Sequence, residues 1–276
     1  MNNIIAVCRR EFASFFFTPI GYVVAGMFAA ISGIAFTLSL FDYSKMSVEP
    51  TAYGFNTTPD FAETLLSPYL VFCGMLIMFL TPLITMRLVA EEKHRGTMEL
   101  LLTWPLRDRD IIFGKFLAAL GMLFVMMLVI AAHLALIGRI TTFEPAVLVF
   151  GLLTVALMGA AFISLGMFIS SVTRNQITSG TITFGVSLLL YVAGNLGERL
   201  PAENPTPAGW PEALRTAAGH VYMLLRGLIV ELAVDAHASE MALGIVQPRD
   251  VAYYLLFTAF FLFLTFRAFE SRNWRA

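Results

Sequence analysis

The residues of this chain that could carry out chemistry are few and scattered. Its four histidines lie far apart in the sequence, and none belongs to an HExxH pattern: His94, His133, His220 and His237. A metal site needs several ligating side chains, and a catalytic nucleophile needs a base beside it. The sequence shows no recognisable motif of either kind. Cys8 falls in an amphipathic stretch and Cys73 in an apolar one, so we expect no disulfide between them. We therefore predict no catalytic residue, no metal site and no enzyme.

Gly114 and Lys115 invite comparison with a phosphate-binding loop. That motif needs an earlier glycine where this chain has Arg109, and a serine or threonine where it has Phe116. The pair is therefore not a nucleotide site, and a chain that performs work must take its energy from another protein. We interpret Lys115 as an anchor whose ammonium group reaches the membrane interface; contact with a partner is the alternative.

The composition indicates that these residues sit in a membrane protein. Hydrophobic residues make up 58% of the chain, charged residues only 13%, and 25 residues are Phe. These values are far from the average of soluble domains. The formal charge of -1 gives no reason to expect nucleic acid. Because the apolar segments leave little chain for anything else, we expect one transmembrane domain over residues 1–276.

Six apolar segments are long enough to cross a bilayer, which needs about 20 residues per helix. They lie near Ile20–Phe41, Tyr69–Met86, Phe116–Ile137, Ala146–Ile169, Ile177–Leu196 and Val251–Phe266. The predicted fold is therefore all-α, with six transmembrane helices and both termini on one side. That side receives twelve of the 18 Lys and Arg residues, so we expect it to face the cytoplasm.

Two further patterns lie at the start of the chain. In residues 1–18 the apolar side chains recur at helical spacing, which predicts an interfacial helix; an extension of the first span is the alternative. Pro19 favours a break between the two helices. Small residues recur every four positions in the first span, which favours close helix packing: Gly21, Ala25, Ala29 and Gly33. The partner is either another span or a second copy of the chain, and we favour subunit contact.

Residues 89–115 form the longest loop on the expected cytoplasmic side. Charged side chains there cannot lie in hydrocarbon, so the run joins the second and third spans in water. Residues 91–103 can form a helix, which Pro105 ends. The motifs Glu91-Glu92, Arg95-Gly96-Thr97, Glu99-Leu100-Leu101-Leu102-Thr103, Pro105 and Gly114-Lys115 resemble the coupling region of ABC-2 type transporter permeases. The opening Arg10-Glu11-Phe12 and the closing Glu270-Ser271-Arg272-Asn273-Trp274 resemble the gliding-motility branch of that family.

The resemblance implies a multi-pass permease subunit of the bacterial cytoplasmic (inner) membrane, surrounded by membrane lipids. A separate cytoplasmic ABC ATPase would hold ATP and Mg, so this chain needs no cofactor. The permease would pair with a second copy or a homologous membrane subunit and would serve export or transmembrane mechanical transmission. The expected ATPase-coupling residues are Glu91, Glu92, Arg95, Gly96, Thr97 and Glu99. The alternative is that these charges only solvate a loop. Arg174 and Asn175 are either a second cytoplasmic contact or a polar turn.

The two outer loops each leave two interpretations open. Residues 197–250 contain an apolar run, 221–232, that is too short to span and is either a re-entrant helix or an amphipathic surface helix. The acidic first outer loop, Asp42–Ser67, either meets a periplasmic partner or simply lacks Lys and Arg.

An ion-coupled secondary transporter is the alternative function. It would need paired acids inside the membrane, and no Asp or Glu lies deep in a predicted span. His133 alone is better interpreted as a hydrogen-bonded packing residue than as part of a proton relay.

Overall fold

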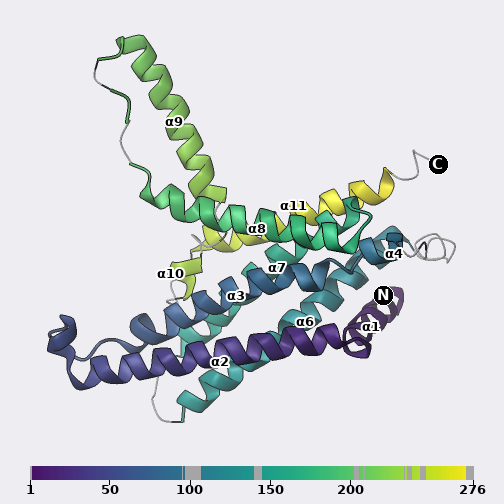
Figure 1. The fold of residues 1–276 in the computed structure, drawn as a ribbon, viewed down its shortest axis with the longest axis horizontal. Helices are drawn as coiled ribbons and strands as arrows, with labels where there is room; N and C mark the ends of the chain where they lie inside the picture. Colours follow the sequence, from purple (N-terminus) through teal and green to yellow (C-terminus); the bar gives the residue numbers. More distant parts are fainter. Residues whose placement is uncertain are drawn as a thin grey trace.

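The computed structural model describes residues 2–94, 96, 107–139, 145–201, 205–207, 209–232, 234, 238–242 and 247–271. Nearly all of these residues are helical, and no β-strand occurs among them, which confirms the predicted all-α fold. The first helix, α1 (Asn2–Phe17), and the end of the last, α11 (Pro248–Glu270), lie at the same end of the molecule (Figure 1). We call this end the α1 end.

Six of the described helical stretches are long and apolar enough to cross a membrane, as predicted. They are α2 (Pro19–Val48), the stretch Ala62–His94, α6 (Asp108–Ile137), α7 (Pro145–Val172), α8 (Gln176–Arg199) and α11. The second stretch consists of a π-helical turn, η2 (Ala62–Leu66), then α3 (Ser67–Thr85) and the short α4 (Ala90–His94). The chain is therefore a multi-pass integral membrane protein.

The ends of several helices follow from local sequence. Pro19 begins α2 and Pro248 begins α11, in the first helical position where a missing N–H costs nothing. Asn175 caps α8, because its side chain accepts a hydrogen bond from Ile177 N at 2.9 Å. The break predicted between the first two helices falls at Thr18.

The helix α2 runs further than expected, to Val48, so Asp42 lies in a helix and not in a loop. Lys45 lies over the Phe41 ring, 4.2 Å from its centroid, and this contact one turn apart supports the extension. The first outer loop is correspondingly shorter. It contains a 3₁₀ turn, η1 (Pro50–Tyr53), before η2 begins.

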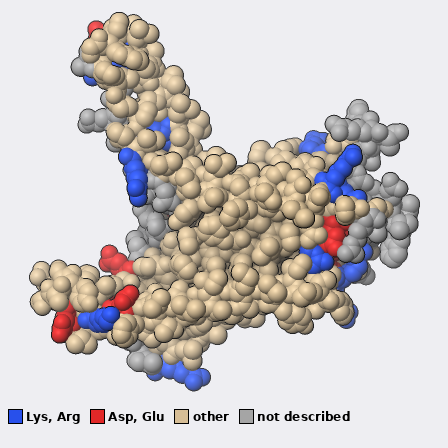
Figure 2. Space-filling view, in the orientation of Figure 1, with Lys and Arg blue, Asp and Glu red and all other residues tan. Residues whose placement is uncertain are grey.

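The centre of the bundle is α7, which packs against α3, α6, α8 and α11. One buried apolar cluster joins α1, α2, α3, α6 and α7, and a second joins α3 and α7 to α11 and to the short α10 (Ala238–Ala242). Charged side chains gather toward the two ends of the bundle on the face in Figure 2, and uncharged atoms fill the belt between them. That distribution suits a bilayer around the belt.

The helix α9 (Glu212–Leu232) projects away from the bundle beyond the end of α8 (Figure 1). It is 21 residues long, so the helix begins well before the apolar run 221–232. Of its residues only Gly219 is buried. The two interpretations of the run 221–232, a re-entrant helix and an amphipathic surface helix, therefore both stay predictions.

Candidate functional site

At the α1 end the chain leaves α3 through a break. Pro82 lies in the last turn of α3, which ends at Thr85, and the chain becomes helical again only at Ala90. The break leaves backbone N–H groups at the start of α4 without helical partners. Ser170, on α7, satisfies two of them, because its Oγ accepts from Val89 N at 3.1 Å and from Ala90 N at 3.0 Å. A side chain of α7 therefore caps α4.

A second contact fixes α4 to the joint between α1 and α2. Within the break, Arg87 Nε donates to Glu91 Oε2 at 2.7 Å. The same guanidinium donates through Nη1 to Thr18 Oγ1 at 2.7 Å, and Thr18 is the residue between α1 and α2. Lys93 adds a hydrogen bond from Nζ to the carbonyl of Ser171, at the end of α7.

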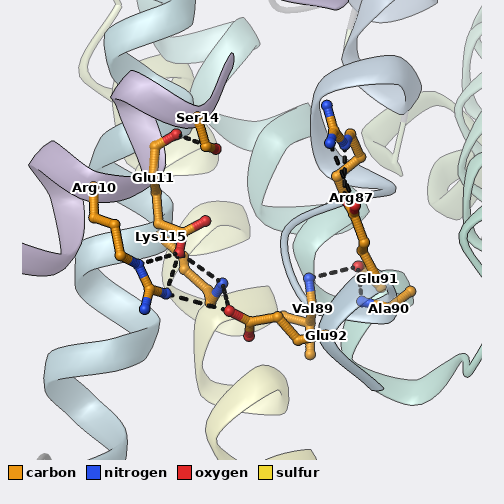
Figure 3. Close-up of polar contacts among 10 residues, drawn as sticks. Arg10, Glu11, Ser14, Arg87, Val89, Ala90, Glu91, Glu92 and Lys115 are labelled. Atoms are coloured by element: carbon orange, nitrogen blue, oxygen red, sulfur yellow. Dashed lines mark hydrogen bonds and ion pairs between the residues drawn. The ribbon is translucent and has the colours of Figure 1, made fainter. Parts of the chain in front are cut away.

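The third contact is a group of four charges, three of them mostly buried, which we call the Lys115 cluster: Arg10, Glu11, Glu92 and Lys115 (Figure 3). Lys115 Nζ lies 2.9 Å from Glu92 Oε1 and 3.3 Å from Glu11 Oε1. The Lys115 side chain is 0% exposed, and the two carboxylates are 14% and 18% exposed. Two cations and two anions balance, which offsets part of the cost of burying them.

Arg10 closes the cluster on its exposed side. Its guanidinium contacts Glu11 and reaches Glu92 Oε1 at 3.3 Å, while 54% of its side chain stays exposed. Burial acts to lower the pKa of Arg10, but the hydrogen bond and charge of Glu11 and the charge of Glu92 outweigh it and raise that pKa. Arg10 therefore stays cationic at every physiological pH.

Two glycines of α6 let α1 approach closely enough to form this cluster. A Cβ atom on Gly114 would lie 2.7 Å from Val7 Cβ, and one on Gly121 would lie 2.8 Å from the Phe12 ring. The Gly114-Lys115 pair thus has a structural explanation. The glycine provides the space for α1, and the lysine that follows it pairs with α1 and α4.

A cleft of about 330 Å³ separates α1 from the α3–α4 break. It is lined by Glu11, Ser14, Phe15, Phe17, Thr18, Arg87, Leu88, Glu91 and Glu92. The part of the chain that the structure describes holds no group of His, Cys, Asp or Glu side chains arranged for a metal ion.

The predicted coupling residues fall into two groups. Glu91 and Glu92 lie on α4, and both carboxylates contact other parts of the same chain. Gly96 follows α4 with φ +69°, a left-handed conformation that suits glycine. Arg95, Thr97 and Glu99 lie outside the described residues. Contact of any of these residues with an ATPase stays a prediction.

The interpretation of Lys115 as an anchor reaching the membrane interface is wrong. The helix α6 begins at Asp108, two turns before Lys115, so the lysine lies inside the helix. Its side chain is enclosed by α1 and α4 and does not reach lipid headgroups.

Arg174 and Asn175 both lie exposed in the turn between α7 and α8, two helices that each contact α4. Asn175 caps α8, so that residue has a structural role. Their function as a second cytoplasmic contact stays a prediction.

The stripe of small residues on α2 is only partly buried by the rest of the chain. Gly21 is buried against Phe15, and a Cβ on Gly33 would lie 3.6 Å from His133 Nε2. Ala25 and Ala29 are half-buried. Besides Gly21, α2 buries Val24, Phe28, Ser32 and Phe36, which lie outside the stripe. Contact of the stripe with a second subunit stays a prediction.

His133 is a hydrogen-bonded packing residue, as expected. Its Nδ1 lies 2.7 Å from the Tyr69 hydroxyl, and its ring stacks on Phe36 with centroids 5.1 Å apart. It lines an open apolar groove of about 590 Å³ between α2 and α6.

Sequence reasoning missed Ser170, Arg87 and Thr18 altogether, and it missed the partners of Lys115. The sequence showed no sign of a partner for Glu11, because its position lies outside the apolar side predicted for residues 1–18. Nor did it indicate which of the 18 Lys and Arg residues would pair with this carboxylate.

These features define a polytopic membrane subunit in which a short helix between two spans is fixed by polar contacts to its neighbours. The chain belongs to the ABC-2 family of transporter proteins, since the family described as ABC-2 family transporter protein matches residues 6–274. It is therefore a membrane permease subunit of an ABC transporter. Such subunits are typically non-catalytic, and the family implies association with a cytoplasmic ATPase. No curated protein matched the chain.

Proposed function

We propose that this permease couples ATP hydrolysis in a separate cytoplasmic ABC ATPase to export or to transmembrane mechanical transmission. The observation that carries the proposal is the fixation of α4. Ser170 holds it to α7, Arg87 to the α1–α2 joint, and Lys115 to α6. A force applied to α4 would therefore be transmitted to α2, α3, α6 and α7 as a rigid-body movement.

In this proposal the α1 end faces the cytoplasm of a bacterium, and both termini lie there. ATP and Mg belong to the ATPase. The contact with the ATPase is made by residues that follow α4 in the sequence: Arg95, Gly96, Thr97 and Glu99. Glu91 and Glu92 support that contact by fixing α4 to its neighbours. Arg174 and Asn175 form the adjacent secondary contact.

The functional assembly contains two permease subunits, either two copies of this chain or one copy with a homologue. The resemblance at both ends of the chain to the gliding-motility branch supports transmission as strongly as export. A periplasmic partner would meet the outer ends of α2 and α3.

The experiment is a mild-detergent pull-down of tagged protein from its native membrane and cytosol, with ATP hydrolysis assayed on the eluate. We expect a stoichiometric ABC-type ATPase in the wild-type eluate. Arg95→Glu or Glu99→Lys should remove that ATPase, because charge reversal opposes a polar interface. Glu270→Gln is the matched control at the same end, since its exposed ion pair with Arg267 lies on α11 and involves no residue of α4.

Recovery of the permease with no ATPase in any preparation would contradict the proposal and favour an ion-coupled secondary transporter. Unchanged ATPase recovery with both charge reversals would place the contact elsewhere on the α1 end.

A further inference from the structure

The helices α1 and α4 meet on one lysine of a third helix. Lys115 Nζ contacts Glu11 from α1 and Glu92 from α4, and no part of the lysine side chain reaches solvent. In the sequence, one acidic partner of this lysine precedes the first span and the other follows α3. Figure 3 shows the lysine pointing between the two carboxylates.

The energetics of burial tie the two helices together. A buried charge that loses its partner is strongly destabilising, whereas the intact set is close to balanced. If α4 moves away from α6 alone, Lys115 keeps Glu11 and loses Glu92. If α1 moves alone, the reverse holds. Either separate movement leaves one cluster member in the protein interior without its full set of counter-charges.

We infer that Lys115 is a positioning residue that holds α1 and α4 together as one mechanical unit on α6. A displacement of α4 is then passed to α1 through Lys115, and to the start of α2 through the bond between Arg87 and Thr18. The link is a property of the chain alone. Its use during transport rests on the proposed function.

The chain carries a natural reporter for this link. Cys8 lies on α1 beside Val7, which packs on Gly114, and it is half-buried against the core. Burial raises the pKa of the Cys8 thiol above its ordinary value. Release of α1 should therefore speed its alkylation by exposing the thiol and by lowering that pKa. Cys73 is fully buried in α3 and serves as the internal control for global unfolding.

The test measures the rate of maleimide attachment to Cys8 in the purified full-length permease, without ATPase, at one fixed pH. Glu92→Gln changes only α4, yet we expect it to speed labelling of Cys8 on α1 by about tenfold, which corresponds to about 1.4 kcal/mol. Lys115→Met should act in the same direction. Lys115→Arg should restore most of the protection, because it keeps the charge.

Two controls separate the lysine from the rest of the cluster. Arg10→Gln removes the exposed bridge between Glu11 and Glu92 and should change the rate by less than about twofold. Glu270→Gln removes an exposed ion pair on α11 and should change nothing. Cys73 should stay unlabelled throughout.

Wild-type labelling rates in Glu92→Gln, or an equal effect from Arg10→Gln, would overturn the inference. If Lys115→Met fails to fold, Glu92→Gln and Lys115→Arg still decide it. Addition of the ATPase tests the use of the link separately. Nucleotide should change Cys8 labelling in the wild type and change it less in Glu92→Gln. Failure of that second arm alone would count against the proposed coupling and leave the link intact.

Discussion

Gly114 is the residue on which the closest approach of α1 to α6 depends. A methyl group there would lie 2.7 Å from Val7 Cβ and 3.1 Å from the carbonyl oxygen of Ile4. Gly114→Ala should therefore displace α1 and destabilise the protein by about 1–3 kcal/mol, as overpacking typically does. The measurement is thermal unfolding in detergent, together with the Cys8 labelling rate.

Gly26 on α2 provides the matched control, because a Cβ there would meet nothing within 4 Å. Gly26→Ala should leave stability unchanged or raise it slightly, since alanine is the better helix former. Equal effects of the two substitutions would contradict the close seating of α1 on α6.

Three carboxylates at the α1 end are mostly buried, although Glu270 at the same end is exposed. The carboxylates Glu11, Glu91 and Glu92 point into the protein and are 14–18% exposed, whereas Arg9, Arg10 and several other arginines of this end face outward. The sequence predicted that Glu91 and Glu92 either contact an ATPase or only solvate a loop, and it gave no partner for Glu11. It could not show that these carboxylates are buried, because the cation that attracts Glu11 and Glu92 lies on another helix, at Lys115.

At the scale of elements, the docking of α4 depends on a side chain outside α4. Ser170 accepts hydrogen bonds from two backbone N–H groups at the α3–α4 break. Ser170→Ala should leave both without that acceptor and cost about 1–2 kcal/mol locally. We expect faster hydrogen exchange at residues 89–94 and unchanged exchange in the middle of α7.

Ser271→Ala is the comparison for this change, because that hydroxyl donates only to the carbonyl of Ala268 in its own helix end. Exchange at residues 89–94 that matches the wild type in Ser170→Ala would mean that the other contacts alone fix α4.

The sequence predicted the elements better than their contacts. Each span was found because a long, predominantly apolar segment has few stable environments other than a bilayer or a protein core. The observed helix ends, such as Val48 and Asp108, lie beyond the predicted ones. A helix can continue into water after its apolar segment has ended. The cap of α4 by Ser170 was beyond prediction, since serine at a helix end normally serves its own helix.

At the scale of the whole molecule, α9 is a long helix with little support, because Gly219 is its single buried residue. Its described contacts with the bundle include hydrogen bonds from Tyr222 to the carbonyl of Pro201 and from Arg226 to that of Leu200. Leu214, Val221, Leu225, Leu228 and Leu232 stay exposed along it. Limited proteolysis of the purified chain in detergent should therefore cut first within residues 205–232, with the spans left intact.

Mass spectrometry of the first fragments checks this expectation. Initial cleavage in the first outer loop, with α9 protected, would show that another copy, a partner or the detergent covers the apolar side of α9.

The distance along the chain between the members of the Lys115 cluster has a consequence for biogenesis. Arg10 and Glu92 are 82 positions apart, and Lys115 follows later still. At ribosomal speeds α1 leaves the ribosome on the order of ten seconds before its counter-charges exist. During that interval Glu11 and the apolar side of α1 need a temporary host, and the membrane surface is the nearest one. The first helix to be made is thus among the last to reach its final place.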